Sequence, residues 1–339
     1  MTAPLLFRSV SGCSLRRFSA SVLSVALLCA MCVPMVACSK NAATGRSQFL
    51  AMSRDEEIAL GEEAQPELTE QYGGAVTDPA INAYLTDIGQ ALAAQTEADN
   101  PSLPWEFTLL DDDIINAFAL PGGKVFLSRG LAEKMTNEAQ LAAVVGHEIG
   151  HVTARHSNER FGQQLGLGIG GAVLGAVIGG VIDSDNGVGI GAGIGGTVGG
   201  IAALSYSRDQ EIEADRLGMR YMERLGYDPR GAIQVQEILG EASKGQGRPP
   251  EILSTHPLSS TRIRALEKRF EKYYQHTVNN PAYQLYPERY QQRMLSRLNQ
   301  MARGLSVIGN AVLASADDEF GGLGPAHVWC GHCRAAHEH

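Results

Sequence analysis

Apolar residues recur at the three- and four-residue spacing of amphipathic helices along much of the chain, and they alternate with polar residues only briefly. WEFTLL (105–110) alternates as a strand does, and NAFALPGGKVFLSRGL (116–131) predicts two short strands around a Pro-Gly-Gly turn. We therefore expect an α+β fold that is predominantly helical, with a small β-sheet edge. Helices are predicted at 54–68, 78–95, from 138, 207–226, about 261–275 and 284–314, with a polar loop after 226.

Residues 165–204 depart from this pattern because they are mostly Gly, Ala, Val and Ile, interrupted once by DSDN. Glycines recur every fourth residue on both sides of the interruption, and on a helix they form one stripe that another backbone can approach closely. This spacing predicts an inserted Gly-rich apolar helical hairpin, acting as a lid or dipping into a membrane. A flexible loop is the alternative, because each interior Gly costs a helix roughly 1 kcal/mol.

Residues 1–37 have the layout of a secretory signal. Three arginines precede the apolar run SVLSVALLCAMCVPMVA, which is short for a spanning helix. MVAC is similar to a bacterial lipobox, so we expect a lipid anchor on Cys38 and a tether over 38–52. Ser39 after the cysteine predicts a lipoprotein at the periplasmic face of the outer membrane. Cleavage by the ordinary signal peptidase is the alternative.

Charge and cysteine content exclude two classes of protein. The chain has 37 acidic and 28 basic residues, a net charge of −9, and loss of the leader's three arginines takes it to −12. Such an acidic body excludes nucleic acid as a partner, since phosphate backbones need basic surfaces. Beyond the anchor only Cys330 and Cys333 remain, so disulfides do not staple the fold. Their WCGHC motif lies in a tail, 318–339, predicted to be disordered.

LAAVVGHEIGHVTARH carries the clearest candidate chemistry, on a helix whose N-terminal cap is predicted at Asn137 with Gln140. On a helix, His147 and His151 lie one turn apart on one face, so both imidazoles can reach a single ion. Glu148 lies close enough to hold a water on that ion without becoming a ligand. This spacing suits zinc, although H-E-x-x-H also occurs by accident.

A catalytic zinc site needs a third protein ligand, and SRDQEIEAD offers Glu211, with Asp215 one turn further on the same face. Glu211 could complete a His2Glu set, while Asp215 orients a ligand histidine. The alternative is a solvated helix face with charge pairs at i,i+4, which suits Glu213. Gly146 and Gly150 would let another segment pack tightly against the histidine helix.

HEIGHVTARH followed by SRDQEIEADRLG resembles the HtpX and CAAX-protease superfamily of zinc metalloendopeptidases, in particular its exported bacterial branch of BepA- and LoiP-like periplasmic proteases. TGRSQF, NAFALPGGKVFLSRGL and STHPLSSTRI also occur in the family's order, so the resemblance covers roughly residues 44–270. It implies one Zn²⁺ per chain, with His147, His151 and Glu211 as metal ligands. It also implies Glu148 as the general base that takes a proton from the attacking water.

The predicted elements and this resemblance together give the expected domain organisation. A zincin-like metallopeptidase domain is expected at 53–275, with the Gly-rich hairpin inserted, and a helical extension at 276–317. The long Gly-rich insert departs from the family's pattern, and so does the lack of a C-terminal helical-repeat domain. Both departures concern partner binding rather than the metal site.

Three further features have both functional and structural interpretations. His256 could reach the site, to stabilise the oxyanion or to occupy the open zinc position, or it could cap the following helix. His156 is expected to be structural, because it falls past the ligand face. The LPGGKVFLS strand could accept an extended substrate along its edge, or it could be a plain core strand.

The sequence thus predicts a zinc-dependent endopeptidase of the bacterial cell envelope that hydrolyses misfolded or unassembled envelope proteins. A zinc-stabilised, chaperone-like protein that binds unfolded outer-membrane proteins without cutting them is the second hypothesis. A membrane-interacting Gly-zipper module is the third. The presence of Glu148 favours the first, since a protein that does not cut has no need of a general base.

Overall fold

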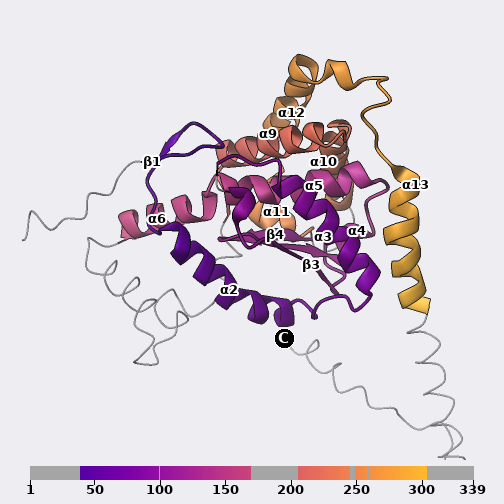
Figure 1. The fold of residues 1–339 in the computed structure, drawn as a ribbon, viewed down its shortest axis with the longest axis horizontal. Coiled ribbons are helices and arrows are strands. Elements are labelled where there is room, and N and C mark those ends of the chain that lie inside the picture. Colours follow the sequence, from indigo (N-terminus) through magenta and orange to yellow (C-terminus); the bar gives the residue numbers. More distant parts are fainter. Residues whose placement is uncertain (1–38, 99, 169–204, 245–248, 259, 304–339) are drawn as a thin grey trace, which may run out of the picture.

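A computed structural model describes residues 39–98, 100–168, 205–244, 249–258 and 260–303 (Figure 1). The predicted signal segment, Cys38, most of the Gly-rich hairpin and the C-terminal tail lie outside these residues. The main elements, in chain order, are β1 (Ser39–Lys40), β2 (Ser47–Gln48), α2 (Arg54–Gln71), α3 (Pro79–Ala93), β3 (Glu106–Leu110), β4 (Ala117–Leu120), β5 (Lys124–Ser128), α4 (Arg129–Ala132), α5 (Glu138–Thr153), α6 (His156–Gly168), α9 (Arg208–Arg224), α10 (Arg230–Ser243), α11 (Ile252–Thr255), α12 (Ser260–Tyr273) and α13 (Pro287–Tyr290).

The three-stranded sheet has the order β3-β5-β4, with β5 parallel to β3 and antiparallel to β4. Both predicted strands of the 116–131 segment are confirmed, and the tight turn between them uses Gly122 and Gly123 at φ +80° and +100°. Side chains with a Cβ rarely adopt these angles, which explains the glycine pair. Because β5 is paired on both sides, the expectation that substrate adds along its edge is wrong.

Two apolar clusters hold helices on the two faces of this sheet. Leu60, Ala64 and Leu68 of α2 pack against Phe118 and Phe126 on one face. On the other face the larger core joins the sheet to α3, α5 and α9, so that α5 is buried from end to end. Figure 1 shows the sheet between α2 below and α5 and α9 above. The result is the expected predominantly helical α+β fold with a small mixed sheet.

The predicted polar loop after residue 226 is wrong, because it contains the helix α10. Ala232, Val235 and Leu239 lie on one face of this helix at the i, i+3 and i+4 spacing, and all three are buried. The apolar residues are few and are interspersed with Gln and Glu, which obscured the pattern. The other predicted helices are confirmed where the structure describes them, the last one continuing from α13 to residue 303.

Residues 39–48, inside the segment expected to be a tether, form the β1–β2 hairpin. The hairpin is tied to the corner between α5 and α6 by Asn41, which donates to the Thr153 carbonyl at 2.9 Å. Gln48 donates in the same way to the Ala154 carbonyl at 2.7 Å. Over the described ranges, no helix combines the length and the apolar character that crossing a membrane requires.

Candidate metal centre

The histidine helix α5 begins as its sequence predicts, with the Asn137 side chain accepting from the Gln140 backbone N–H at 3.0 Å. His147 and His151 lie one turn apart on it, and their Nε2 atoms are 3.0 Å apart. Both rings are buried, with 8% and 2% of the residue exposed. The two imidazoles therefore converge on one point inside the protein.

Helix α9 crosses α5 at very short range because both helices carry glycine at the crossing. A Cβ on Gly150 would lie 2.8 Å from the Ala214 carbonyl oxygen, and a Cβ on Gly218 would lie 2.9 Å from the backbone nitrogen of His147. This confirms the prediction that glycines beside the motif admit a closely packed neighbour. The crossing brings the first turn of α9 over the histidine pair, and with it Glu211.

The Glu211 carboxylate lies between the two imidazoles. Its Oε1 is 3.3 Å from His151 Nε2, and its Oε2 is 3.5 Å from His147 Nε2. One turn later on α9, Asp215 Oδ1 lies 2.8 Å from His147 Nδ1. A hydrogen bond from Nδ1–H to Asp215 leaves the Nε2 lone pair of His147 free to face the cluster.

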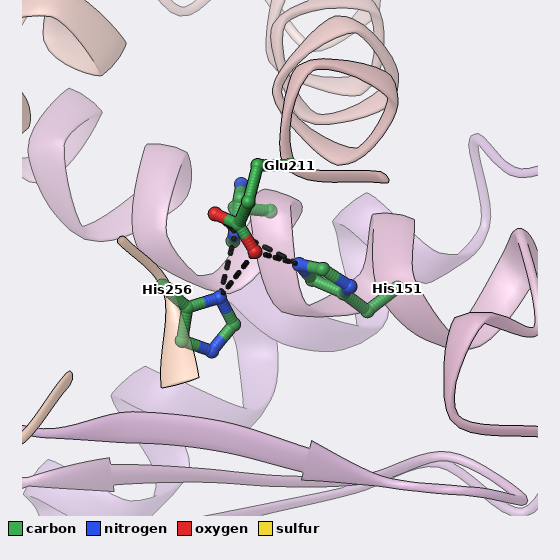
Figure 2. A group of neighbouring side chains, drawn as sticks. His151, Glu211 and His256 are labelled. Carbon is green, nitrogen blue, oxygen red and sulfur yellow. Dashed lines mark hydrogen bonds and ion pairs between the residues drawn. The ribbon is translucent and has the colours of Figure 1, made fainter. Parts of the chain in front are cut away.

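His256 completes the cluster from the C-terminal end of α11, with its Nδ1 2.9 Å from Glu211 Oε1 and 3.3 Å from His147 Nε2. Figure 2 shows the Glu211 carboxylate pointing between the His151 and His256 rings. The four residues each offer a donor atom, and these atoms lie within 4.8 Å of one another. Four donors around tetrahedral zinc at 2.0–2.1 Å lie about 3.3 Å apart, so the observed separations fit that ion.

Glu148 supplies a second test of the fit. It is buried, with 1% of the residue exposed, and neither carboxylate oxygen has a hydrogen-bond partner in the part of the chain that the structure describes. Its Oε1 lies 3.7 Å from His256 Nε2. Burial raises the pKa of Glu148 above its ordinary value. A buried carboxylate beside the cluster that has no hydrogen-bond partner among the described residues is arranged to accept a proton from a molecule bound there.

Arg262 is a functional residue that sequence reasoning missed. Its guanidinium is buried and binds Asp215 at both oxygens, with Nε–Oδ2 at 2.6 Å and Nη2–Oδ1 at 2.8 Å. Its Nη1 lies 2.5 Å from Glu211 Oε2. The STHPLSSTRI motif contains this arginine, but nothing in its spacing relates it to Asp215, which lies 47 positions earlier. Arg262 fixes both carboxylates that face the histidines.

The charges of the cluster favour a bound cation. Burial would raise the pKa of Glu211, but His256, Arg262 and His147 outweigh it and hold that pKa well below its usual range. Burial likewise opposes ionisation of Asp215, and Arg262 lowers its pKa. Burial and Arg262 lower the pKa of His147, yet Asp215 and Glu211 raise it to about 9. A histidine that binds a metal is neutral, so with His147 as a ligand the three carboxylates and one guanidinium leave two negative charges, which a divalent ion neutralises.

The opposite wall of the site is formed by His156 and Tyr206. The Tyr206 ring lies against the His151 ring with centroids 3.9 Å apart. His156 is fully buried, and its Nδ1 lies 2.9 Å from His151 Nδ1. Glu213, expected on a solvated face, is instead bonded to His156. His156 therefore touches a cluster residue directly.

Comparison with known proteins agrees with this geometry. The family model of peptidase family M48 matches residues 79–270. The beta-barrel assembly-enhancing protease of Escherichia coli K12 is 32% identical over 243 residues, 70% of this chain and 50% of that protein. The mitochondrial metalloendopeptidase OMA1 of Schizosaccharomyces pombe is 30% identical over 226 residues, 66% of this chain and 64% of that protein.

The putative beta-barrel assembly-enhancing protease of Vibrio cholerae is 28% identical over 220 residues, 65% of this chain and 45% of that protein. The chain thus spans about half the length of these bacterial relatives. The family match covers more than half of the chain and includes every residue of the cluster. The chain belongs to peptidase family M48, a family of zinc metalloendopeptidases, and His147, His151, Glu211 and His256 form its zinc site.

Proposed function

We propose that this chain is a zinc-dependent endopeptidase that hydrolyses misfolded or unassembled proteins of the bacterial cell envelope. The observation that carries the proposal is the buried Glu148 carboxylate, which has no hydrogen-bond partner among the described residues and lies adjacent to three convergent metal donors. A site that bound zinc only to stabilise the fold would have no use for such a group, whose burial is unfavourable. The family membership supports the same activity.

We assign the metal to His147, His151 and Glu211, and the general base to Glu148. Zinc held there supplies a Lewis acid that polarises the scissile carbonyl and makes an attacking water more acidic. Glu148 takes the proton of that water at a carboxylate oxygen and returns it to the leaving amine. Burial raises the pKa of Glu148, which makes its carboxylate a stronger base for the first of these steps. Asp215 orients His147 through Nδ1.

His256 is proposed as the fourth donor of a resting arrangement rather than as the oxyanion stabiliser. Its Nδ1 lies among the donor atoms, while its Nε2 lies 3.7 Å from Glu148. A catalytic zinc site keeps one position open for substrate, so His256 would have to move aside for zinc held by the other three residues to act on a carbonyl. The H256A variant is then more active than wild type on an unfolded substrate, and a less active variant contradicts this role.

The substrate class and location are proposed from the relatives and the leader. The bacterial relatives are named for enhancing beta-barrel assembly, which supports unfolded or stalled envelope proteins as substrates. The lipobox-like MVAC supports a lipid anchor at Cys38 on the periplasmic side of the outer membrane. Palmitate labelling of whole cells tests this: wild type is labelled, and equal labelling of the C38A variant contradicts the anchor.

The decisive test compares casein degradation by the purified protein and by E148Q. The variant keeps all four donor atoms, so it is expected to hold one zinc per chain while losing nearly all hydrolysis. Zinc content measured on the same samples separates loss of the base from loss of the metal. Equal turnover by the two proteins contradicts the peptidase proposal. Tight binding of unfolded protein without cleavage by wild type would instead support the chaperone-like hypothesis.

A further inference from the structure

The imidazole of His151 has a second neighbour on the side away from the cluster. Its Nδ1 lies 2.9 Å from Nδ1 of His156, which is the first residue of α6 and fully buried. Two imidazole nitrogens at this distance share a single proton, so one of them donates and the other accepts. The direction of this hydrogen bond therefore depends on which of the two histidines carries a proton on Nδ1.

The zinc site sets that direction. His151 Nε2 is the atom that faces the cluster, at 3.0 Å from His147 Nε2 and 3.3 Å from Glu211 Oε1. A histidine that binds a metal through Nε2 carries its proton on Nδ1. His151 Nδ1–H is then the donor, His156 Nδ1 is the acceptor, and His156 carries its own proton on Nε2.

The series of hydrogen bonds continues from His156 towards the protein surface. His156 Nε2 lies 3.1 Å from Glu213 Oε2, which accepts the second proton. Arg46 Nη2 lies 3.1 Å from the same oxygen, and Arg46 also pairs with Glu159 at 2.5 and 2.8 Å. Each step therefore has a donor facing an acceptor, and the direction is fixed from both ends.

The arrangement parallels that of the other ligand histidine. His147 is backed by Asp215, which a buried arginine holds. His151 is backed by a carboxylate and an arginine as well, with one extra imidazole between the ring and the carboxylate. A carboxylate behind a ligand histidine fixes the tautomer and makes the ring a stronger donor to the metal.

We propose that His156, Glu213 and Arg46 are positioning residues that fix the tautomer and orientation of His151 as a zinc ligand. This rests on the proposed role of His151 in binding zinc. Arg46 belongs to the β1–β2 hairpin, which is bonded to the backbone at Thr153 and Ala154. The hairpin that precedes α2 is therefore a structural part of the metal centre.

The first test is a tautomer measurement on the zinc-loaded wild-type protein, which needs no variant to fold. Two-bond ¹⁵N–¹H correlation of the histidine rings reports which nitrogen carries the proton. We expect His151 protonated at Nδ1 and zinc-shifted at Nε2, and His156 protonated at Nε2 only. If His156 is protonated at Nδ1, or at both nitrogens, the proposed direction of the hydrogen bonds from His151 to His156 and Glu213 is wrong. Absence of a zinc shift on His151 overturns the ligand assignment itself and is thus distinguishable.

The second test measures zinc affinity by competition with a fluorescent chelator. E213L removes the acceptor and is expected to bind zinc on the order of 10- to 100-fold more weakly, the usual effect of losing a group that orients a ligand. E213Q keeps an amide oxygen that accepts from His156, so it should recover much of that loss.

The matched control is E223L, on the same helix. Glu223 pairs with the half-exposed His276 at 3.2 Å, and neither residue is one of the four metal donors. E223L is expected to bind zinc within twofold of wild type. A folded E213L that binds zinc as tightly as E223L contradicts the proposal. So does an E213Q that is as weak as E213L.

Discussion

A single methyl group at Gly150 tests the packing that assembles the metal centre. Gly150 lies on α5 between Glu148 and His151, where α9 crosses. In the G150A variant the new Cβ would lie 2.8 Å from the Ala214 carbonyl oxygen and 3.1 Å from its Cα. Both atoms belong to the backbone of α9, so no side-chain rotation relieves the overlap and the helices must separate.

The size of the effect follows from these distances. The oxygen is about 0.6 Å inside the 3.4 Å at which ordinary contact begins. Such overpacking costs about 1–3 kcal/mol, while replacing a helical glycine by alanine gains roughly 1 kcal/mol. The free energy of unfolding of the metal-free protein therefore falls by no more than about 2 kcal/mol. Relieving this overlap moves α9, and Glu211 with it, by more than the roughly 0.2 Å by which zinc–ligand distances can vary. Zinc affinity therefore falls by at least about tenfold.

The assay pairs urea unfolding of the metal-free protein with zinc titration in a chelator buffer. G240A is the matched control, because Gly240 is also inside a helix but its Cβ would meet only a leucine methyl at 3.7 Å. G240A should gain roughly 0.5–1 kcal/mol of stability and leave zinc affinity unchanged. If G150A binds zinc as tightly as G240A, the close crossing of α5 and α9 does not position Glu211.

Three further predictions concern charge and metal. R262M removes the arginine that pairs with the buried Glu211 and Asp215 carboxylates. It should lower the free energy of unfolding in excess chelator by about 3–5 kcal/mol, against ±0.5 kcal/mol for the exposed R264M; equal denaturation midpoints would refute it. Burial raises the pKa values of Glu159 and Glu213, but hydrogen bonds and charges, those of Arg46 included, lower them below 4.5. The stability these carboxylates contribute is thus present above pH 4.5 and lost as pH falls further. The difference in free energy of unfolding between wild type and R46M, measured by urea unfolding, should therefore become smaller below pH 4.5; a difference that does not change with pH counts against this. Removing zinc by chelation should abolish hydrolysis and lower the melting temperature, with both restored by added zinc; a melting temperature indifferent to zinc contradicts it.

The sequence predicts the parts of the fold whose signals are local. Helix α5 has its cap at Asn137 and an unbroken apolar run, and the paired strands around Gly122 have a turn that only glycine favours. The H-E-x-x-H spacing and the acidic pair on α9 are likewise local patterns. The close packing at Gly146 and Gly150 was predicted because glycine has no side chain and lets another segment approach the helix closely.

The parts that escaped prediction depend on contacts between distant segments. Arg262 lies 115 positions after His147, and no periodicity relates the two. The hairpin at 39–48 is short and polar, and its bonds go to backbone carbonyls at the end of α5, which leave no mark on the sequence. Helix α10 has a narrow apolar face, which its interspersed Gln and Glu residues conceal.

His156 was expected to be structural, and its contact with His151 was not predicted, for a related reason. A helical projection from α5 places it away from the ligand face, but the helix ends at Thr153 and the chain turns through Arg155 at φ +57°. After this turn α6 begins with His156 against His151. One helical period extended across this break does not reveal the contact between His156 and His151.

The central claim is that one zinc ion is held jointly by two imidazoles of α5 and the carboxylate of Glu211. Anomalous diffraction from crystals of the zinc-loaded protein, collected on both sides of the zinc absorption edge, tests it most directly. We predict one anomalous peak per chain, within about 2.0–2.2 Å of His147 Nε2, His151 Nε2 and a Glu211 oxygen. A peak elsewhere, or one that Glu211 does not reach, would contradict the account.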